Sequence, residues 1–153
     1  MQLVRRLLGT SPVAADLGLL VMRLWLGGVM FVAHGVGKWG KLDSFAAGLE
    51  ARGYPIPEVM AVLAALAESV GSLFVALGLL TRPAALTLLT TMLVAALVQH
   101  APDPWGKKEL PLTFAVMALA LVVAGAGRFS LDHLLHRRLQ RGVAAATEPP
   151  PER

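Results

Sequence analysis

The chain has 153 residues, of which 56% are hydrophobic and 16% are charged, and its formal net charge is +4. Its mean hydropathy of +0.63 exceeds what a soluble domain of this size needs for one core, which indicates a membrane protein. It has no cysteine, which excludes disulfides, thiolate zinc sites, cysteine-ligated iron–sulfur clusters and a thiol nucleophile in this chain.

The first apolar run follows a basic segment, residues 1–12, that we place in the cytoplasm. Ser11 and Pro12 are typical of a helix start. The run is long enough to cross a hydrocarbon core of about 30 Å. It is too long for a secretory signal, and it contains Asp16 and Arg23. We therefore predict a first membrane span that stays in the mature protein.

Three further apolar runs alternate with segments rich in glycine, proline and charged residues. Residues 37–56 are predicted to form an interfacial loop or a short amphipathic helix. A short connection near Arg82 turns the chain straight back, so the second and third spans are expected to be antiparallel neighbours. The predicted spans of one bundle domain, residues 13–127, are 13–36, 57–80, 83–100 and 109–126.

The segment after the bundle is basic and amphipathic. Residues 128–142 carry leucines on one helix face and arginines elsewhere, a pattern that predicts a helix on the membrane surface. Residues 143–153 are rich in proline and are predicted to be disordered. The predicted fold is therefore all-α, an integral membrane four-helix bundle with a basic C-terminal surface helix.

The basic residues indicate orientation and not nucleic-acid binding. They lie between apolar blocks and form no stripe with interleaved aromatic residues, so no nucleic-acid partner is expected. In the predicted topology, eight lysines and arginines lie on the side of the termini and five on the other side. This excess predicts that both termini of the multi-pass protein lie in the cytoplasm.

Two charged residues are predicted to meet inside the bilayer. Arg23 lies about 15 Å into the first span from one side, and Glu68 about 16 Å into the second span from the other. A guanidinium can hold a carboxylate with two parallel hydrogen bonds, which offsets the cost of burying both charges. Such a pair either fixes helix packing or serves as an anchor for a polar headgroup or as a proton acceptor.

A second polar cluster is predicted at the outer mouth of the bundle. His34 and Lys38 are one helical turn apart, Gln99 and His100 end the third span, and Glu109 begins the fourth. We interpret His34, Glu68 and His100 as candidate catalytic residues, and Arg23, Lys38, Gln99 and Glu109 as candidate ligand-binding residues. The alternative is that helix ends at an interface are polar without a site.

The same residues do not predict a metal centre. Two histidines can ligate a metal or a b-type haem, but the sequence has no HxxxH or HxxE spacing, so no metal site is assigned. The six methionines are interpreted as packing residues. No phosphate-binding glycine loop, dinucleotide fingerprint or Ser/His/Asp arrangement is present.

The order of these features resembles the DoxX family of small four-helix bacterial membrane proteins. The resemblance runs from residue 14 to residue 135 and is carried by several stretches in family order. These are RLWLGGVMFVAHGVGK (23–38), GYPIPEVMA (53–61), ESVGSLFVALGLLTRPAAL (68–86), His100, Glu109 and GAGRFSLD (125–132).

The resemblance implies an inner-membrane bundle with redox work. Members resembling DoxX and DoxD are associated with thiosulfate:quinone oxidoreductase and with complexes that handle sulfur or oxidative stress. The leading hypothesis is thus a redox-associated membrane subunit, which would be an oxidoreductase subunit if it is an enzyme. The candidate ligand is a quinone. The candidate protein partner is a redox enzyme, and a homo-oligomer is also an option. The alternatives are a non-catalytic scaffold that recruits a partner, and a transporter of small solutes or metals.

Overall fold

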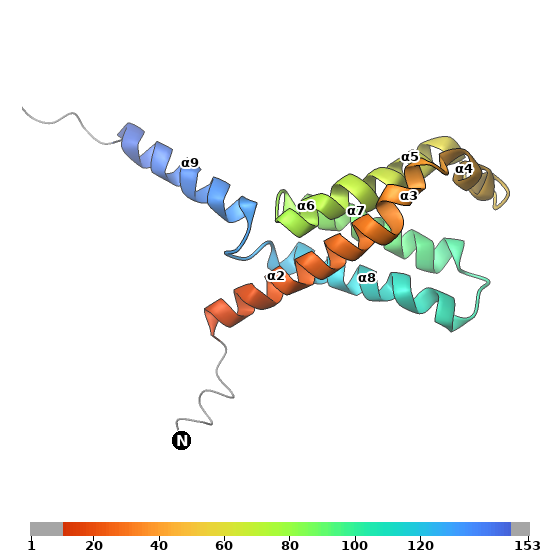
Figure 1. The fold of residues 1–153 in the computed structure, drawn as a ribbon, viewed down its shortest axis with the longest axis horizontal. Coiled ribbons are helices and arrows are strands. Elements are labelled where there is room, and N and C mark those ends of the chain that lie inside the picture. The colour runs from red at the N-terminus through yellow and green to blue at the C-terminus, as the bar shows by residue number, and fades with distance from the viewer. Residues whose placement is uncertain (1–10, 148–153) are drawn as a thin grey trace, which may run out of the picture.

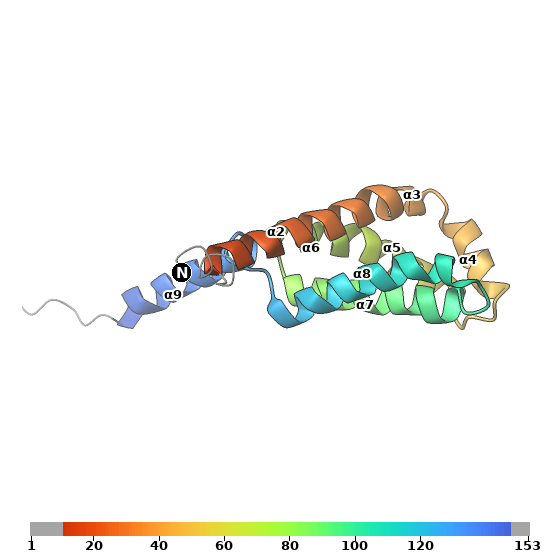
Figure 2. The same cartoon turned by 90° about the horizontal axis from the view of Figure 1, so that it is seen from below.

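The structure, a computed structural model, describes residues 11–147, and in this range every regular element is a helix (Figure 1). Long helices run roughly along one axis, as the two perpendicular views in Figures 1 and 2 show. Helices long and apolar enough to cross a membrane span Pro12–Trp39, Pro57–Leu77 and Thr81–Gln99. The prediction of an all-α membrane protein is confirmed.

The long helical segments that follow one another without a break are called rods here. The first rod is continuous, but its helical winding changes along its length. Helix α2 (Pro12–Val29) passes into the π-helical segment η1 (Met30–Gly35) and then into α3 (Val36–Trp39). After a turn at Gly40, α4 (Leu42–Glu50) begins. The segment predicted as an interfacial loop or short amphipathic helix therefore contains a helix, and α4 packs on the start of the next rod.

The second and third rods repeat this change of winding. The second consists of α5 (Pro57–Leu66), η2 (Ala67–Gly71) and α6 (Ser72–Leu77), and the third of α7 (Thr81–Val94) and η3 (Ala95–Gln99). Gly78 ends the second rod with a φ of +68°, a left-handed conformation that glycine adopts without a steric penalty. The chain turns back there, so the two rods are antiparallel.

Helices α8 (Trp105–Ala124) and α9 (Leu131–Thr147) complete the described chain. Charged residues confined to the first turns of α8 are followed by an apolar stretch, and α8 lies along α7 (Figure 2). The helix α9 leaves the end of the bundle and continues to Thr147, past the predicted boundary at residue 142. The first ten residues and residues 148–153, including most of the predicted cytoplasmic segment and the end of the predicted tail, lie outside the described range.

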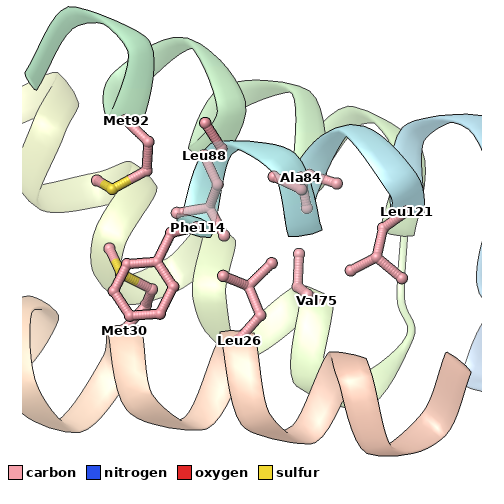
Figure 3. Packing of buried hydrophobic residues seen from close by; sticks show 11 residues of the cluster. Leu26, Met30, Val75, Ala84, Leu88, Met92, Phe114 and Leu121 are labelled. Carbon is pink, nitrogen blue, oxygen red and sulfur yellow. The ribbon is translucent and has the colours of Figure 1, made fainter. Parts of the chain in front are cut away.

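The core lies where α2, α6, α7 and α8 meet (Figure 3). Leu26 and Met30 face Val75, Leu88 and Phe114 across this interface, and all are buried. The remaining buried positions include many alanines, which let helices approach closely where lipid supplies no hydrophobic driving force. Three residues of this core, Ala84, Met92 and Phe114, also line the groove described below.

Candidate functional site

The most buried ion pair among the described residues joins Lys38 and Glu68. The Lys38 Nζ lies 2.5 Å from Glu68 Oε2, and only 6% of the Glu68 side chain and 19% of the Lys38 side chain are exposed. The same ammonium lies 4.5 Å from the centre of the Phe45 ring, a cation–π contact. Next to it, the Trp39 indole donates to Ser69 Oγ at 3.1 Å. The end of the first rod is therefore fastened to η2 by two polar contacts.

The predicted Arg23–Glu68 pair is wrong. Arg23 is fully buried, but its guanidinium donates to the carbonyl of Phe129, in the loop before α9. It lies against Gly78, where a Cβ would collide with it. Arg23 thus holds together α2, the turn after α6 and the loop after α8, at the end of the bundle opposite to the ion pair.

The physical reason is the register between the first two rods. Gly27 faces the backbone of Ser72 and Ala76, and Gly35 faces the backbone of Glu68 and Ser69. The start of α5 therefore packs beyond Trp39, against α4, and α2 begins beyond the turn at Gly78. The depth prediction assumed that both helices begin and end at the same membrane level, and this assumption fails by several turns.

A groove of about 1130 Å³ runs along the bundle beside the ion pair. One wall comes from α5, η2 and α6, the other from α7 and η3, and residues from α4 and α8 close one end. Leu63, Leu66 and Leu86 line it and are also 40–59% exposed. The groove therefore opens sideways, toward the lipid in a membrane.

Polar groups gather at one end of the groove. His34, Lys38, Gln99 and His100 all line it. The His34 ring packs edge-to-face on Phe114, with centroids 6.4 Å apart. The prediction that residues of the first and third spans share one mouth therefore agrees with their positions in the groove lining.

Two further predicted residues lie outside this lining. Glu68 is buried behind Lys38 and contributes to the mouth only through it. Glu109 is exposed in the first turns of α8 and does not line the groove, although its neighbour Lys107 does. Among residues 11–147, no three histidine and acidic side chains lie close enough together to hold a metal ion.

Two residues that the sequence interpretation did not assign to the site, Asp103 and Tyr54, lie at the mouth or contact a residue that lines it. His100 Nδ1 lies 2.7 Å from Asp103 Oδ2, and this hydrogen bond is the main reason why the pKa of Asp103 is lowered. The i,i+3 spacing of the two residues was the available signal. The Tyr54 phenol also lines the groove, and burial raises its pKa, so it stays neutral.

Two atoms at this mouth lack a partner. Within the described chain, neither the Tyr54 hydroxyl nor Gln99 Oε1 accepts or donates a hydrogen bond, although both atoms are buried. An unsatisfied buried polar atom costs roughly 1–3 kcal/mol. These atoms therefore favour a ligand with hydrogen-bonding groups at this end of the groove.

Each rod that forms the mouth is π-helical at this level. His34 lies in η1, Glu68 in η2 and Gln99 in η3. The wider winding displaces side chains from the positions of an α-helix, and such segments occur frequently at functional sites. Sequence patterns with a period of 3.6 residues do not signal this change.

The fold is that of a multi-pass membrane protein with an internal polar site. Its apolar rods pack through buried alanines and glycines, and its groove is polar at one end and open to lipid. The DoxX family model matches residues 18–101. The chain is also 33% identical, over 130 residues, to the "Inner membrane protein YqjF" of Escherichia coli (strain K12), covering 80% of this chain and 95% of that protein. No solved structure matches the chain. The chain belongs to the DoxX family and is a multi-pass bacterial inner-membrane protein.

Proposed function

We propose that this protein is a redox-associated subunit of the inner membrane that binds a quinone, or an amphiphile of similar shape, in the lateral groove. The observation that carries the proposal is a single cavity with mostly apolar walls and a polar end. The three threonines that line the α7 wall, Thr87, Thr90 and Thr91, donate their hydroxyl hydrogens to backbone carbonyls of the same helix. An amphiphile has the same division, because its tail is apolar and its headgroup is polar.

The length of the groove fits a tail. On α7 and η3 the lining residues extend from Pro83 to Gln99, which is roughly 24 Å at about 1.5 Å per residue. An isoprenoid or acyl chain can lie along this wall and enter from the bilayer through the side opening. A soluble substrate gains nothing from such an entrance.

The polar end supplies groups for a quinone headgroup. Lys38 and Tyr54 can donate to the carbonyl oxygens, and Gln99 Oε1 can accept from a quinol hydroxyl. The imidazoles of His34 and His100 have ring nitrogens that can donate or accept a hydrogen bond, so either can act as a proton carrier when a quinone is reduced or a quinol is oxidised. The chain has no cysteine, so the electrons come from a partner protein or a further cofactor.

The experiment uses Trp39 as a reporter, because it follows the lining residue Lys38 directly, although it does not itself line the groove. Trp25→Phe and Trp105→Phe leave it as the only tryptophan of the three. Decylubiquinone is titrated into this variant in lipid nanodiscs, and quenching of indole fluorescence is followed. We expect saturable quenching, whereas quenching that rises linearly and equals that of free tryptophan in the same lipid contradicts the proposal.

A matched pair of substitutions in η3 tests the location. Ala95 lines the groove, and Leu97, two residues further, does not and is 61% exposed. Ala95→Phe fills the groove and is expected to weaken binding by tenfold or more, about 1.4 kcal/mol. Leu97→Phe adds an aromatic ring on the outer side and is expected to leave binding unchanged.

A further inference from the structure

We propose that α9 binds the surface of an anionic phospholipid bilayer at the end of the bundle where it begins. The proposal is independent of the groove. It starts from the attachment of α9 to the bundle, continues with its apolar face, and ends with its charge.

The start of α9 is fixed to the ends of two apolar helices. The Asp132 carboxylate accepts hydrogen bonds from the backbone N–H groups of Leu80 (2.7 Å) and Thr81 (2.9 Å), at the first turn of α7. The Asp132 N–H donates to the carbonyl of Gly78 at 2.8 Å, at the end of α6. Because both rods are long enough to span a membrane, α9 begins at a bilayer boundary.

The loop before α9 is held in the same way. Arg23 donates to the Phe129 carbonyl, and the Asp16 carboxylate accepts from the Arg128 N–H at 2.9 Å. With only this short loop between Ala124 and Leu131, these contacts hold the start of α9 at the end of the bundle. In both views the helix then runs outward from the end of the bundle, closer to the long direction of the bundle than across it (Figures 1 and 2). The proposal therefore requires that α9 tilts toward the bilayer beyond its fixed start.

One face of α9 carries four exposed leucines. Leu131, Leu134, Leu135 and Leu139 follow the i, i+3, i+4 pattern of one helix face, and their side chains are 38–70% exposed. Buried in the interface between headgroups and acyl chains, these side chains would leave water at roughly 25 cal/mol per Å². A helix of this kind lies in the plane of the interface.

The positive charge of α9 favours a bilayer with anionic headgroups. Arg137, Arg138 and Arg141 lie on α9, and all three are exposed. The single carboxylate of the described helix, Asp132, is used by the hydrogen bonds at its start. Arg138, four residues after Leu134, lies on the leucine face itself, where its long side chain can reach the headgroups, while Arg137 and Arg141 lie outside that face. These arginines match an anionic headgroup region, where one basic residue changes the surface-bound population roughly fivefold.

The test uses the full chain, which has no cysteine, with a single nitroxide label in phosphatidylcholine vesicles with or without phosphatidylglycerol. Leu139→Cys carries the label on the apolar face, and Gln140→Cys is the neighbouring control on the polar face. In anionic vesicles we expect oxygen to collide with the label at 139 several times more often than a water-soluble nickel complex does, and the reverse ratio at 140.

The combination Arg137→Gln, Arg138→Gln and Arg141→Gln tests the charge. It is expected to abolish the difference between the two vesicle types at position 139, and raised salt should reduce that difference in the unchanged helix. Equal exposure of positions 139 and 140 to the nickel complex in anionic vesicles overturns the proposal. Protection of position 139 that depends on protein concentration and not on lipid charge also overturns it, in favour of a second copy as the occupant.

Discussion

At the scale of single residues, the Lys38–Glu68 ion pair decides how the first rod meets the second. The carboxylate is almost fully buried and the ammonium is one-fifth exposed. Removing one member of such a pair leaves an uncompensated buried charge, whereas removing both does not. The pair therefore makes the two residues interdependent.

Lys38→Met is expected to lower the free energy of unfolding by about 3 kcal/mol. The double variant Lys38→Met with Glu68→Gln is expected to recover a large part of the loss, because no charge is then left without a partner. The measurement is unfolding in mixed micelles with increasing dodecyl sulfate. Lys41→Met, at an exposed lysine of the same end, is the control and should be neutral. Additive losses in the double variant would contradict the coupling.

The Asp103–His100 contact predicts a pH dependence at the mouth. The hydrogen bond from His100 holds the pKa of Asp103 below its usual range, with a smaller contribution from the Lys107 charge. A lowered pKa of a folded carboxyl contributes stability that is present above the ordinary pKa of aspartate and is lost as the pH falls through the folded value.

His100→Ala should move the pKa of Asp103 up, toward that of a free aspartate. Carboxyl carbon shifts of Asp103, followed by NMR between neutral and strongly acidic pH, measure this value directly. An Asp103 titration that is the same with and without His100 would show that the contact does not form in the membrane.

At this scale, the sequence indicated which polar residues belong to the site more accurately than it indicated which residues pair with one another. It placed His34, Lys38 and His100 at one mouth, which the groove lining agrees with. It paired Glu68 with Arg23, whereas the structure pairs Glu68 with Lys38. Counting residues from the end of a span gives the depth of a residue only if neighbouring helices end at the same membrane level. Register depends on which backbones can touch, and that is a property of two helices together.

At the scale of elements, Gly27 sets the distance between α2 and α6. A Cβ at this position would lie 2.6 Å from the backbone nitrogen of Ala76 and 2.9 Å from its Cβ, whereas a Cβ at Gly28 meets nothing within 4 Å. The adjacent glycines thus form a matched pair, one in a tight contact and one in open space.

Gly27→Ala is expected to destabilise the protein by about 1–3 kcal/mol, the range for an extra methyl group in a packed interface. Gly28→Ala should be neutral or stabilise by up to about 1 kcal/mol, because alanine is the better helix former. Unfolding in mixed micelles compares the two variants. An equal effect of both substitutions would mean that α2 and α6 do not pack as described.

The positions of the helices could be predicted from the sequence, but the change from α-helical to π-helical winding within them could not. Long apolar runs interrupted by glycine, proline and charge indicate membrane helices directly, and the observed rods begin at Pro12, Pro57 and Thr81. The π-helical segments η1, η2 and η3 have no such signal, since their hydrophobicity is continuous with that of the flanking turns.

At the scale of the whole molecule, the groove lies directly beside the packed core, and Ala84, Met92 and Phe114 belong to both. The core residues come from α2, α6, α7 and α8, while the groove lies mainly between the second and third rods. Composition predicted that the protein is embedded in lipid, but a cavity open to lipid depends on how far two helices diverge. The ligand proposed for it follows from this shape and from the groups at its end.

The most direct measurement is photolabelling with a quinone that carries a diazirine in its alkyl tail, followed by mass spectrometry of the labelled peptides. The full chain is labelled in nanodiscs, and a phospholipid with a diazirine in its acyl chain serves as the reference. We predict that the quinone adducts concentrate on groove residues of Leu63–Val70 and Thr87–Val94 and are displaced by unlabelled decylubiquinone. Quinone adducts that match the phospholipid pattern and resist displacement would contradict a binding site in the groove.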